Sequence, residues 1–221
     1  MAPEEVERSR ITQLERAAAA LAGGGCIVYP TETFYALGAC VGSAKALERV
    51  NAIKCRPRSK PLPVIIGAMS QLEGVLSPDA SSWTGYGAAR ALMERFWPGP
   101  LSIIVPARAD LPPQIKDARG FVSVRFTPNA EAQALCLMAG SPLAATSANV
   151  SGDPAVNEVG GLSPAVCLGA DYVFQGAPEP AGGMPSTVVC PSGDGELVLF
   201  REGAVDAAVL EAQGYRLVRH G

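Results

Sequence analysis

The chain has 221 residues, a formal net charge of −3 and 48% hydrophobic residues, which is enough apolar sequence for one large domain with a sizeable core. The acidic balance argues against non-specific binding of nucleic acid through overall charge, so any RNA contact would need a local basic patch. No apolar run approaches the roughly 18 residues of a membrane-spanning helix. The first residues lack the basic and apolar segments of a secretory signal, so we expect a cytoplasmic protein.

The cysteine and histidine content excludes several kinds of site. The six cysteines form no C-x-x-C pair and several lie in apolar segments, so we expect reduced, buried thiols. The single histidine, His220, is one residue from the end of the sequence. Serine or cysteine catalysis with a histidine base therefore lacks its imidazole, as do histidine-ligated metal sites, and we expect no metal site built from protein ligands.

The first half of the chain alternates between helical and extended patterns. Apolar residues at helical spacing predict a helix over residues 5–22, which three glycines end. A strand over 26–29 and a polar turn over 30–38 follow, and Ser43 is expected to cap a helix that continues to about residue 53. Further along we expect a strand at 63–66, helices at 68–75 and 86–96, a strand at 101–105 and a loop at 107–120.

The second half adds more strands than helices. Residues 121–126 alternate as a strand with Val122 and Val124 on one face and Ser123 and Arg125 on the other. A helix at 129–139, a strand at 142–145, a polar turn at 146–152 and strands at 172–174, 187–190 and 197–200 follow. Helices and strands mix without strict βαβ repetition, which predicts a single-domain α/β fold with one open, twisted, mixed sheet and flanking helices.

Two turns that follow predicted strands are rich in hydroxyl side chains. The first carries Thr31, Glu32, Thr33 and Tyr35, and the second is the 146–152 stretch TSANVSG. Strand ends are where an open α/β sheet usually binds its ligand, and hydroxyl and small residues suit a polar ligand or a phosphate. Capping and turn roles explain these residue types equally well. Ser147 lacks a histidine base, so we do not expect it to act as a nucleophile.

Four cations lie within seven residues between prolines: Lys54, Arg56, Arg58 and Lys60. In an extended segment alternate positions share one face, which would match a polyphosphate. A solvated surface run is the alternative interpretation. The sequence contains neither a P-loop nor a G-x-G-x-x-G motif, so an ATP site here would be of an unusual kind.

Arg125 lies on the polar face of an otherwise apolar strand, where a guanidinium needs an anion. A ligand carboxylate held by two parallel hydrogen bonds is one candidate for that anion. An internal aspartate or glutamate is the other, and the residues alone leave both open.

Seven stretches occur together and in order across residues 12–205. They are 29–38 (YPTETFYALG), 54–57 (KCRP) with 60–62 (KPL), 96–101 (FWPGPL), 124–126 (VRF), 146–152 (TSANVSG), 185–189 (PSTVV) and 200–203 (FREG). In this combination the chain resembles the YrdC-like family, the threonylcarbamoyl-AMP synthases of the single-domain TsaC type. The resemblance implies that L-threonine, bicarbonate or CO2, and ATP with Mg²⁺ are converted to threonylcarbamoyl-AMP and pyrophosphate, for threonylcarbamoyladenosine formation on tRNA.

The resemblance also implies site residues within a concave, locally basic cavity of the sheet. Thr33, Tyr35, Arg125, Ala145 and Ser186 would line the threonine site. Lys54, Arg56, Lys60, Ser147, Asn149 and Arg201 would hold ATP. Implied partners are the tRNA-modification proteins that receive the product, and tRNA or double-stranded RNA could be contacted directly through a local basic patch.

The implied catalytic domain covers residues 11–205, with residues 206–221 as a C-terminal tail that packs on it. Three positions depart from the family pattern: Ala36 replaces a usual glycine, Ile65 replaces a histidine found in some members, and Ala155 replaces a common serine. Two other functions stay open. One is a carbamoyl-adenylate-forming carbamoyltransferase domain, and the other is a non-catalytic RNA-binding module; ATP turnover that depends on threonine separates the synthase from both.

Overall fold

The computed structural model describes residues 3–57, 59–176, 179–193 and 195–220. The helices are α1 (Pro3–Ala22), α2 (Ala44–Ile53), α3 (Tyr86–Phe96), α4 (Ala130–Met138), α5 (Pro164–Gly169) and α6 (Ala207–Glu211), with short 3₁₀ turns η1 (Met69–Gly74), η2 (Ala80–Ser82), η3 (Pro113–Ile115) and η4 (Val159–Gly161). The strands are β1 (Ile27–Pro30), β2 (Tyr35–Gly38), β3 (Val64–Ile66), β4 (Leu101–Pro106), β5 (Phe121–Phe126), β6 (Leu143–Ala144), β7 (Thr146–Ser147), β8 (Tyr172–Val173), β9 (Thr187–Gly193), β10 (Glu196–Arg201) and β11 (Arg216–Arg219).

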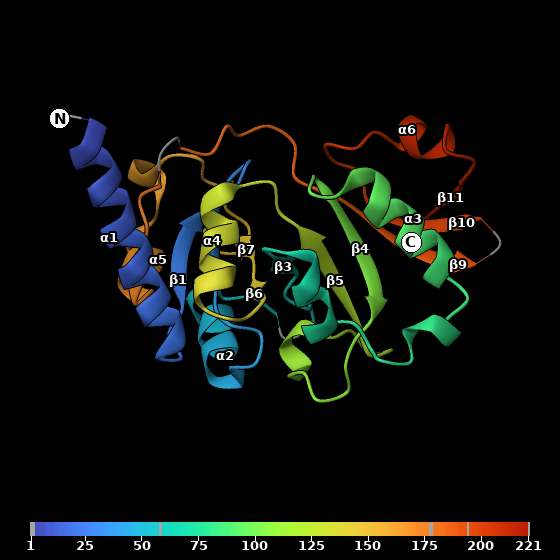
Figure 1. Cartoon of the computed structure of the whole chain (residues 1–221), viewed down its shortest axis with the longest axis horizontal. Helices are drawn as coiled ribbons and strands as arrows, with labels where there is room; N and C mark the ends of the chain where they lie inside the picture. Colours follow the sequence, from blue (N-terminus) through green and yellow to red (C-terminus); the bar gives the residue numbers. More distant parts are fainter. Residues whose placement is uncertain (1–2, 58, 177–178, 194, 221) are drawn as a thin grey trace.

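The strands form two mixed sheets, which meet near β6 and β7. The larger has seven strands in the order β11-β10-β9-β4-β5-β3-β6, and the smaller has four in the order β7-β2-β1-β8. Figure 1 shows α1, α2, α4 and α5 around the smaller sheet, and α3 and α6 near the far end of the larger one. The mixed α/β fold is confirmed, but the strands are divided between two sheets rather than forming one.

The division occurs at Ala145, inside the region predicted as a single strand. The Ala145 amide donates to the Pro63 carbonyl oxygen at 2.8 Å. Before it, β6 pairs with β3 of the larger sheet, and after it β7 pairs with β2 of the smaller one. Ala145 therefore connects the two sheets: Ala144 before it pairs within the larger sheet, and Thr146 after it pairs within the smaller one.

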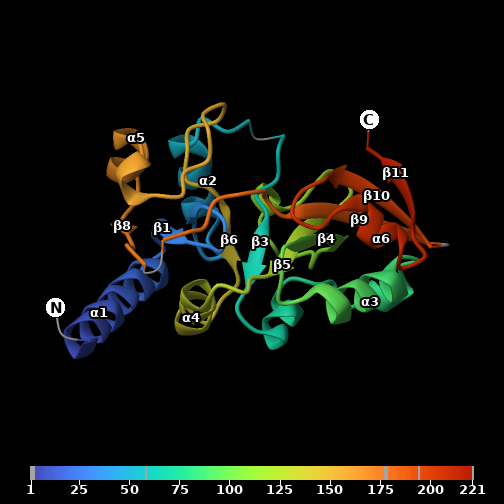
Figure 2. The ribbon, with the colours of Figure 1, turned by 90° about the horizontal axis from the view of Figure 1, so that it is seen from above.

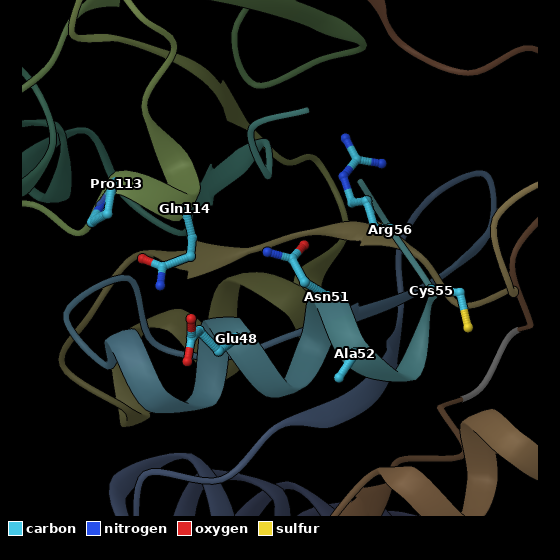
Figure 3. Close-up of a pocket in the computed structure, with 7 residues that line it drawn as sticks. All are labelled: Glu48, Asn51, Ala52, Cys55, Arg56, Pro113 and Gln114. Atoms are coloured by element: carbon cyan, nitrogen blue, oxygen red, sulfur yellow. The ribbon is translucent and has the colours of Figure 1, made fainter. Parts of the chain in front are cut away.

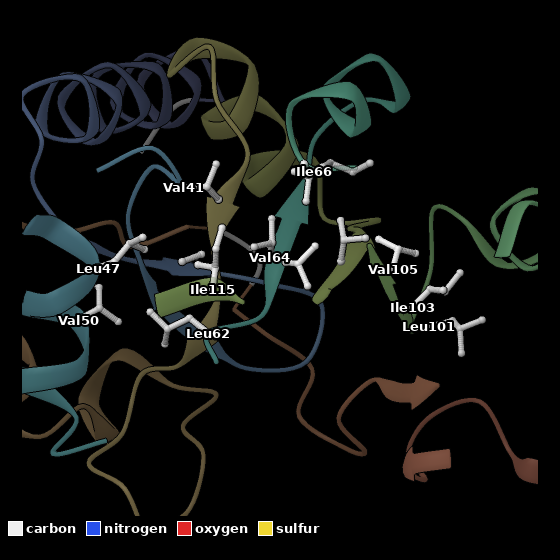
Figure 4. Close-up of a cluster of buried hydrophobic side chains, with 14 of the residues drawn as sticks. Val41, Leu47, Val50, Leu62, Val64, Ile66, Leu101, Ile103, Val105 and Ile115 are labelled. Carbon is white, nitrogen blue, oxygen red and sulfur yellow. The ribbon is translucent and has the colours of Figure 1, made fainter. Parts of the chain in front are cut away.

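The hydrophobic core follows from the alternation of the strands. Val122 and Val124 of β5 are fully buried and pack with Ile103 of β4, which pairs with Val124. Figure 4 shows this cluster continuing from β4 through β3 to Leu47 and Val50 on α2. Since these residues occupy one face of the larger sheet, Ser123 and Arg125 of β5 are left for the other face, as the alternation predicted.

Several boundaries agree closely with the sequence pattern, and three strands were missed, among them β7 in the predicted polar turn at 146–152. The Ser43 side chain caps α2 by accepting from the Ala46 amide at 3.4 Å. Strand β2 lies where a polar turn was expected, and β11 lies in the predicted tail. Gly38 at the end of β2 is required by close approach, because a Cβ there would lie 1.7 Å from the Ala144 carbonyl oxygen.

The last residues are part of the larger sheet. Strand β11 runs parallel to β10, with Glu196 opposite Arg216 and Val198 opposite Val218, and α6 precedes it (Figure 2). The division of the chain into a catalytic domain ending at residue 205 and a separate tail stays a prediction. Among the described helices none combines the length and the apolar character needed to cross a membrane.

Candidate functional site

A cavity of about 520 Å³ lies between the two sheets and brings together residues from across the sequence. Its floor is the polar face of the larger sheet, which contributes Ile65, Ser102, Ser123, Arg125, Val188 and Arg201. The opposite side comes from the turn before β2, from β2 itself and from β7, through Thr31, Thr33, Tyr35, Ala36, Thr146 and Ser147. The cavity is therefore built by the contact between the two sheets.

All five residues expected for the threonine site line this cavity: Thr33, Tyr35, Arg125, Ala145 and Ser186. The turn that carries Thr33 is closed by Thr31, whose hydroxyl donates to the Phe34 carbonyl oxygen at 2.7 Å. The loop before β9 also holds this turn, because the Gly182 amide donates to the Thr33 carbonyl oxygen at 2.8 Å. Thr33 is thus fixed from both sides.

Arg125 is paired with an internal carboxylate. Its Nη1 donates to Glu32 Oε1, and Thr127 Oγ1 donates to Glu32 Oε2 at 3.2 Å. The guanidinium is nearly enclosed, with 9% of the side chain exposed, compared with 22% for Glu32. Since this pair uses one terminal nitrogen of a five-donor group, Glu32 orients the guanidinium in the cavity wall without using all of its donors. The guanidinium can therefore pair with the internal carboxylate of Glu32 and still donate to a ligand carboxylate, the two anions that the sequence left open.

Two hydroxyl groups of the cavity lining are buried without a hydrogen-bond partner among the described residues: Tyr35 Oη and Ser123 Oγ. Burial raises the pKa of Tyr35 to about 12, with a smaller contribution from the negative charges of Glu179 and Glu131. The phenol therefore stays protonated at neutral pH and can donate. A buried polar atom without a partner destabilises the chain, which makes both hydroxyls candidates for ligand contacts.

Lys54 is not among the residues that line the cavity, and its contact with ATP stays a prediction. Its side chain is buried, and its ammonium donates to the carbonyl oxygens of Ser147 and Asn149, the latter at 2.6 Å, and to Asn149 Oδ1 at 3.3 Å. Burial, and less strongly the charge of Arg56, lowers the pKa of Lys54 to about 8. Through these hydrogen bonds Lys54 stabilises the turn at 147–149.

Asn149 also has a local role. Its Nδ2 donates to the carbonyl oxygens of Val150 at 3.0 Å and Asp153 at 2.6 Å, and it is not among the residues that line the cavity. Its neighbour Ser147 does line the cavity. The second hydroxyl-rich turn thus contributes Ser147 directly, while Lys54 and Asn149 fix its shape.

The predicted alternation of cations on one face was wrong, because the chain does not extend after α2. The Arg56 amide donates to the Asn51 carbonyl oxygen and the Cys55 amide to that of Ala52, which is the Schellman pattern of a helix end. Cys55 has a φ of 50°, the left-handed conformation that this pattern requires. Lys54 consequently points inward, and Arg56 lines the cavity.

Lys60, the next described cation of this run, is not in the cavity lining. Lys60 is exposed, and only its carbonyl oxygen meets Arg56, whose Nε donates to it at 3.1 Å. A second bond, from Arg56 Nη2 to the Pro61 carbonyl oxygen at 3.0 Å, fixes the guanidinium further. Arg58 lies outside the described residues. Among the described cations of this segment, Arg56 is thus the one that the structure places at the cavity.

A row of hydrogen bonds connects Arg201 to the cavity floor. Arg201 Nε donates to the Ser186 carbonyl oxygen and its Nη2 to Ser186 Oγ, both at 3.0 Å, and Ser186 Oγ lies 3.0 Å from Ser102 Oγ. Burial lowers the pKa of Arg201, and the positive charge of Arg125 adds to this effect. Ser102 was not among the predicted site residues, because it lies inside the apolar run LSIIVP, where alternation is hard to detect.

The three departures from the family pattern all lie at the cavity: Ala36, Ile65 and Ala155. Ile65 of β3 lies directly opposite Arg125 in the parallel pair with β5. An apolar side chain therefore occupies the position beside the guanidinium. At these positions the lining is apolar, and its arginines and hydroxyls come from other residues.

A second cavity of about 420 Å³ lies on the other side of Arg56, between α2 and η3 (Figure 3). Glu48, Asn51 and Ala52 come from the helix, and Pro113 and Gln114 face them. Arg56 lines both cavities, so it separates this groove from the predicted site.

The electrostatic character of the main cavity is positive. Arg56, Arg125 and Arg201 line it, and within the described ranges no Asp, Glu, His or Cys does so. Nor do the described residues include any group of three or more such side chains that could hold a metal ion. The site is therefore suited to an anionic ligand with several oxygens, and any divalent ion would depend on that ligand for coordination.

The sequence of the chain is similar to that of known proteins. The family model Sua5/YciO/YrdC, described as "Telomere recombination", matches residues 19–203. A threonylcarbamoyl-AMP synthase of Chromobacterium violaceum is 40% identical over 144 residues, covering 65% of this chain and 70% of the relative. One of Bacillus subtilis is 33% identical over 201 residues, covering 90% of this chain and 56% of the relative.

A solved structure is similar over nearly the whole chain. The crystal structure of P. abyssi Sua5 complexed with L-threonine matches with a TM-score of 0.79 and 29% sequence identity, covering 93% of this chain and 58% of that one. The present chain therefore spans little more than half the length of the Bacillus and P. abyssi proteins.

Proposed function

We propose, because the chain belongs to the Sua5/YciO/YrdC family, that it is a threonylcarbamoyl-AMP synthase, a nucleotidyltransferase that uses L-threonine, bicarbonate or CO2, and ATP. The observation that carries this proposal is the single cavity that gathers the five expected threonine contacts together with Arg56, Ser147 and Arg201. The P. abyssi protein of similar fold was crystallised with L-threonine, which supports the amino-acid half of the site.

The reaction we propose has two balanced steps. The threonine amine attacks the carbon of bicarbonate, and water leaves, so that an N-carboxylate (a carbamate) forms. A carbamate oxygen then attacks the α-phosphorus of ATP, the bond to the bridging oxygen breaks, and pyrophosphate leaves with that electron pair. Neither step needs a covalent intermediate with the protein. Positioning and charge neutralisation by Arg56, Arg125 and Arg201 would supply the catalysis, which suits a cavity without histidine.

Mg²⁺ would enter this site with ATP. The cavity lining offers hydroxyls and arginines, so phosphate oxygens and water would be the ligands of the ion. Its chemistry would be to neutralise charge on the phosphates. The arginines of this chain would supply the remaining positive charge and orient the α-phosphorus toward the carbamate.

Pyrophosphate release by the purified chain tests the proposal. We expect release with ATP, Mg²⁺, bicarbonate and L-threonine together, and only background release when any one of the four is omitted. Because the amine of threonine starts the reaction, D-threonine and L-valine are suitable controls for the geometry and the hydroxyl. Equal pyrophosphate release with and without L-threonine would contradict the synthase function and favour one of the two rival functions.

Arg56→Ala should weaken ATP binding and leave threonine binding nearly unchanged. The loss of one charge-assisted contact corresponds to about 1.5–3 kcal/mol, or roughly 10- to 100-fold in affinity. Lys45→Ala is the matched control, since Lys45 is an exposed cation on α2 that is not in the cavity lining. Titration calorimetry with ATP measures both. An unchanged ATP affinity in Arg56→Ala would exclude Arg56 from the phosphate site.

The cellular setting of this reaction is also part of the proposal. Threonylcarbamoyl-AMP would pass to proteins that modify tRNA, and the six free thiols suit the reducing cytoplasm where this occurs. Direct RNA contact stays a prediction. Arginines on the described surface are often paired with acidic residues, as in Arg49–Asp171, Arg119–Asp117 and Arg216–Glu196, which weakens the expectation of an extended basic patch.

A further inference from the structure

We propose that Ser102 and Ser123 form the binding site for bicarbonate and for the carbamate made from it, a planar one-carbon oxyanion between threonine and ATP. This inference rests on the proposed function, and it concerns the one substrate to which neither the sequence motifs nor the family resemblance assigned residues. Both serines line the main cavity from neighbouring strands of its floor, Ser102 from β4 and Ser123 from β5.

Ser102 is prepared to donate a hydrogen bond into the cavity. The guanidinium of Arg201 donates to Ser186 Oγ at 3.0 Å, so the Ser186 proton is directed elsewhere, and Ser102 Oγ lies 3.0 Å away. If Ser186 donates to Ser102, the Ser102 proton is left for a ligand. A chain of hydrogen bonds that begins at a cation polarises each following hydroxyl, and this strengthens the last donor toward an anion.

Ser123 supplies the second, independent observation. Its Oγ is buried and has no hydrogen-bond partner in the described part of the chain, although it lines the cavity. Three serines elsewhere in the chain show the usual partners: Ser43 and Ser163 cap helices, and Ser192 donates to Glu196. A serine buried without a partner on a ligand-facing strand is best explained by a bond that forms with the ligand.

The order of groups across the sheet matches the order of groups in the product. Arg125, expected to hold the threonine carboxylate, lies two positions after Ser123 on β5, a separation of roughly 7 Å along one face. Ser102 lies on the neighbouring strand β4 and pairs with Val188 of β9. Val188 in turn pairs with Arg201 of β10. Ser123 pairs with Ile104 and Val124 with Ile103, so Ser102 lies between Arg125 and Arg201, while Ser123 lies beside Arg125, diagonally across from Ser102. The floor therefore presents a cation, a hydroxyl and a second cation in sequence, with the Ser123 hydroxyl next to the first cation. Threonylcarbamoyl-AMP presents a carboxylate, a carbamoyl group and a phosphate in the same sequence.

The chemistry fits hydroxyl donors better than a further cation at this position. Two carbonate oxygens held by Ser102 and Ser123 leave the carbon open to the amine of threonine, and water carries away the third oxygen. The carbamate then keeps two oxygens, one of which must leave the hydroxyls and attack phosphorus. Neutral donors release it more easily than an arginine would, since charge-assisted hydrogen bonds are about twice as strong.

Steady-state kinetics of Ser102→Ala and Ser123→Ala test the inference, with pyrophosphate release as the readout in buffers depleted of CO2 and supplied with known bicarbonate. We expect the KM for bicarbonate to rise about three- to tenfold in each variant, the range of one neutral hydrogen bond. The affinity for L-threonine, measured without bicarbonate, and the affinity for ATP should each change less than about twofold. Ser192→Ala, at an exposed position of β9, is the matched control and should behave as the wild type.

Thermal unfolding without ligands distinguishes a ligand-binding role of Ser123 from a structural role. Because Ser123 Oγ lacks a partner among the described residues, Ser123→Ala should leave the Tm unchanged or raise it, while the same substitution impairs use of bicarbonate. An unchanged KM for bicarbonate in both variants would overturn the inference and leave the synthase function standing. A wild-type chain that shows no threonine-dependent pyrophosphate release would overturn the proposed function and this inference with it.

Discussion

Arg125→Lys is expected to weaken L-threonine binding about 10- to 100-fold and to leave ATP binding within about twofold, as measured by titration calorimetry. The lysine keeps the positive charge opposite Glu32, but its ammonium cannot form the planar pair of hydrogen bonds that a guanidinium makes with a carboxylate. The Tm should change little, because the ion pair with Glu32 can still form.

Glu32→Gln separates two effects at the same site: the orientation of the Arg125 guanidinium by Glu32, and the binding of threonine. The glutamine side chain keeps the shape and one acceptor, but the buried guanidinium loses its counter-charge, so we expect a lower Tm than in Arg125→Lys and a smaller loss of threonine affinity. If Arg125→Lys lowers the Tm and the folded variant binds threonine as well as the wild type, Arg125 serves only its pair with Glu32. The carboxylate would then be bound elsewhere.

Lys54→Met is expected to lower the free energy of unfolding at pH 7 by about 1–3 kcal/mol and to reduce synthase activity. Methionine fills a similar volume but donates nothing, so Asn149 O and Oδ1 lose the ammonium that holds them. The turn that carries Ser147 would then shift in the cavity wall. Lys60→Met, at an exposed lysine six residues away, should stay within about 0.5 kcal/mol of the wild type. Urea unfolding of both variants gives the comparison, and equal stability would show that the Lys54 contacts contribute nothing.

The pH dependence of Lys54 has a defined sign. Its pKa is about 8 in the folded chain, below the ordinary lysine value of 10.5 that holds in the unfolded chain, so between these values the unfolded chain binds the additional proton. The free energy of unfolding therefore rises with pH across this window through this group, by at most about 1.4 kcal/mol per pH unit. Lys54→Met lacks this contribution, so the stability difference between wild type and variant should widen from pH 7 to about pH 9.5. A difference that stays constant would mean that the Lys54 proton is retained.

The structural features that could be predicted from the sequence were those encoded by residues close together in the chain. The polar face of β5 followed from strict alternation over six residues, and it correctly placed Ser123 and Arg125 opposite the core. The cap of α2 at Ser43 was equally local. The family motifs pointed to the five residues proposed for the threonine site, and the structure gathers all five at one cavity.

The errors came from features that depend on distant parts of the chain or on unusual backbone geometry. The Schellman end of α2 is normally announced by a glycine, but here Cys55 adopts the left-handed conformation, so the inward turn of Lys54 had no sequence signal. Strand β2 is short and follows a polar turn, and it exists because β1 and β7 pair with it. The division into two sheets occurs at Ala145, in an otherwise ordinary apolar segment that carries no sequence signal for it.

Glu32 illustrates a different limit. The sequence placed it in a candidate cluster, yet its partner Arg125 is 93 residues away, and only the fold brings them together. The pair changes the interpretation of the site, because the guanidinium that we propose binds the threonine carboxylate is already held in place by Glu32. Positioning of this kind reduces the cost of ordering the guanidinium when threonine arrives.

The most direct test of the synthase function is the identity of the product. Purified chain is incubated with ATP, Mg²⁺, L-threonine and ¹³C-bicarbonate, quenched rapidly, and the nucleotides are separated and weighed by mass spectrometry. We expect threonylcarbamoyl-AMP with the ¹³C label in its carbamoyl carbon, formed in equal amount to pyrophosphate and greatly reduced in Arg125→Lys. Release of ADP and phosphate, or of AMP without any labelled threonine adduct even in quenched samples, would contradict the proposed function.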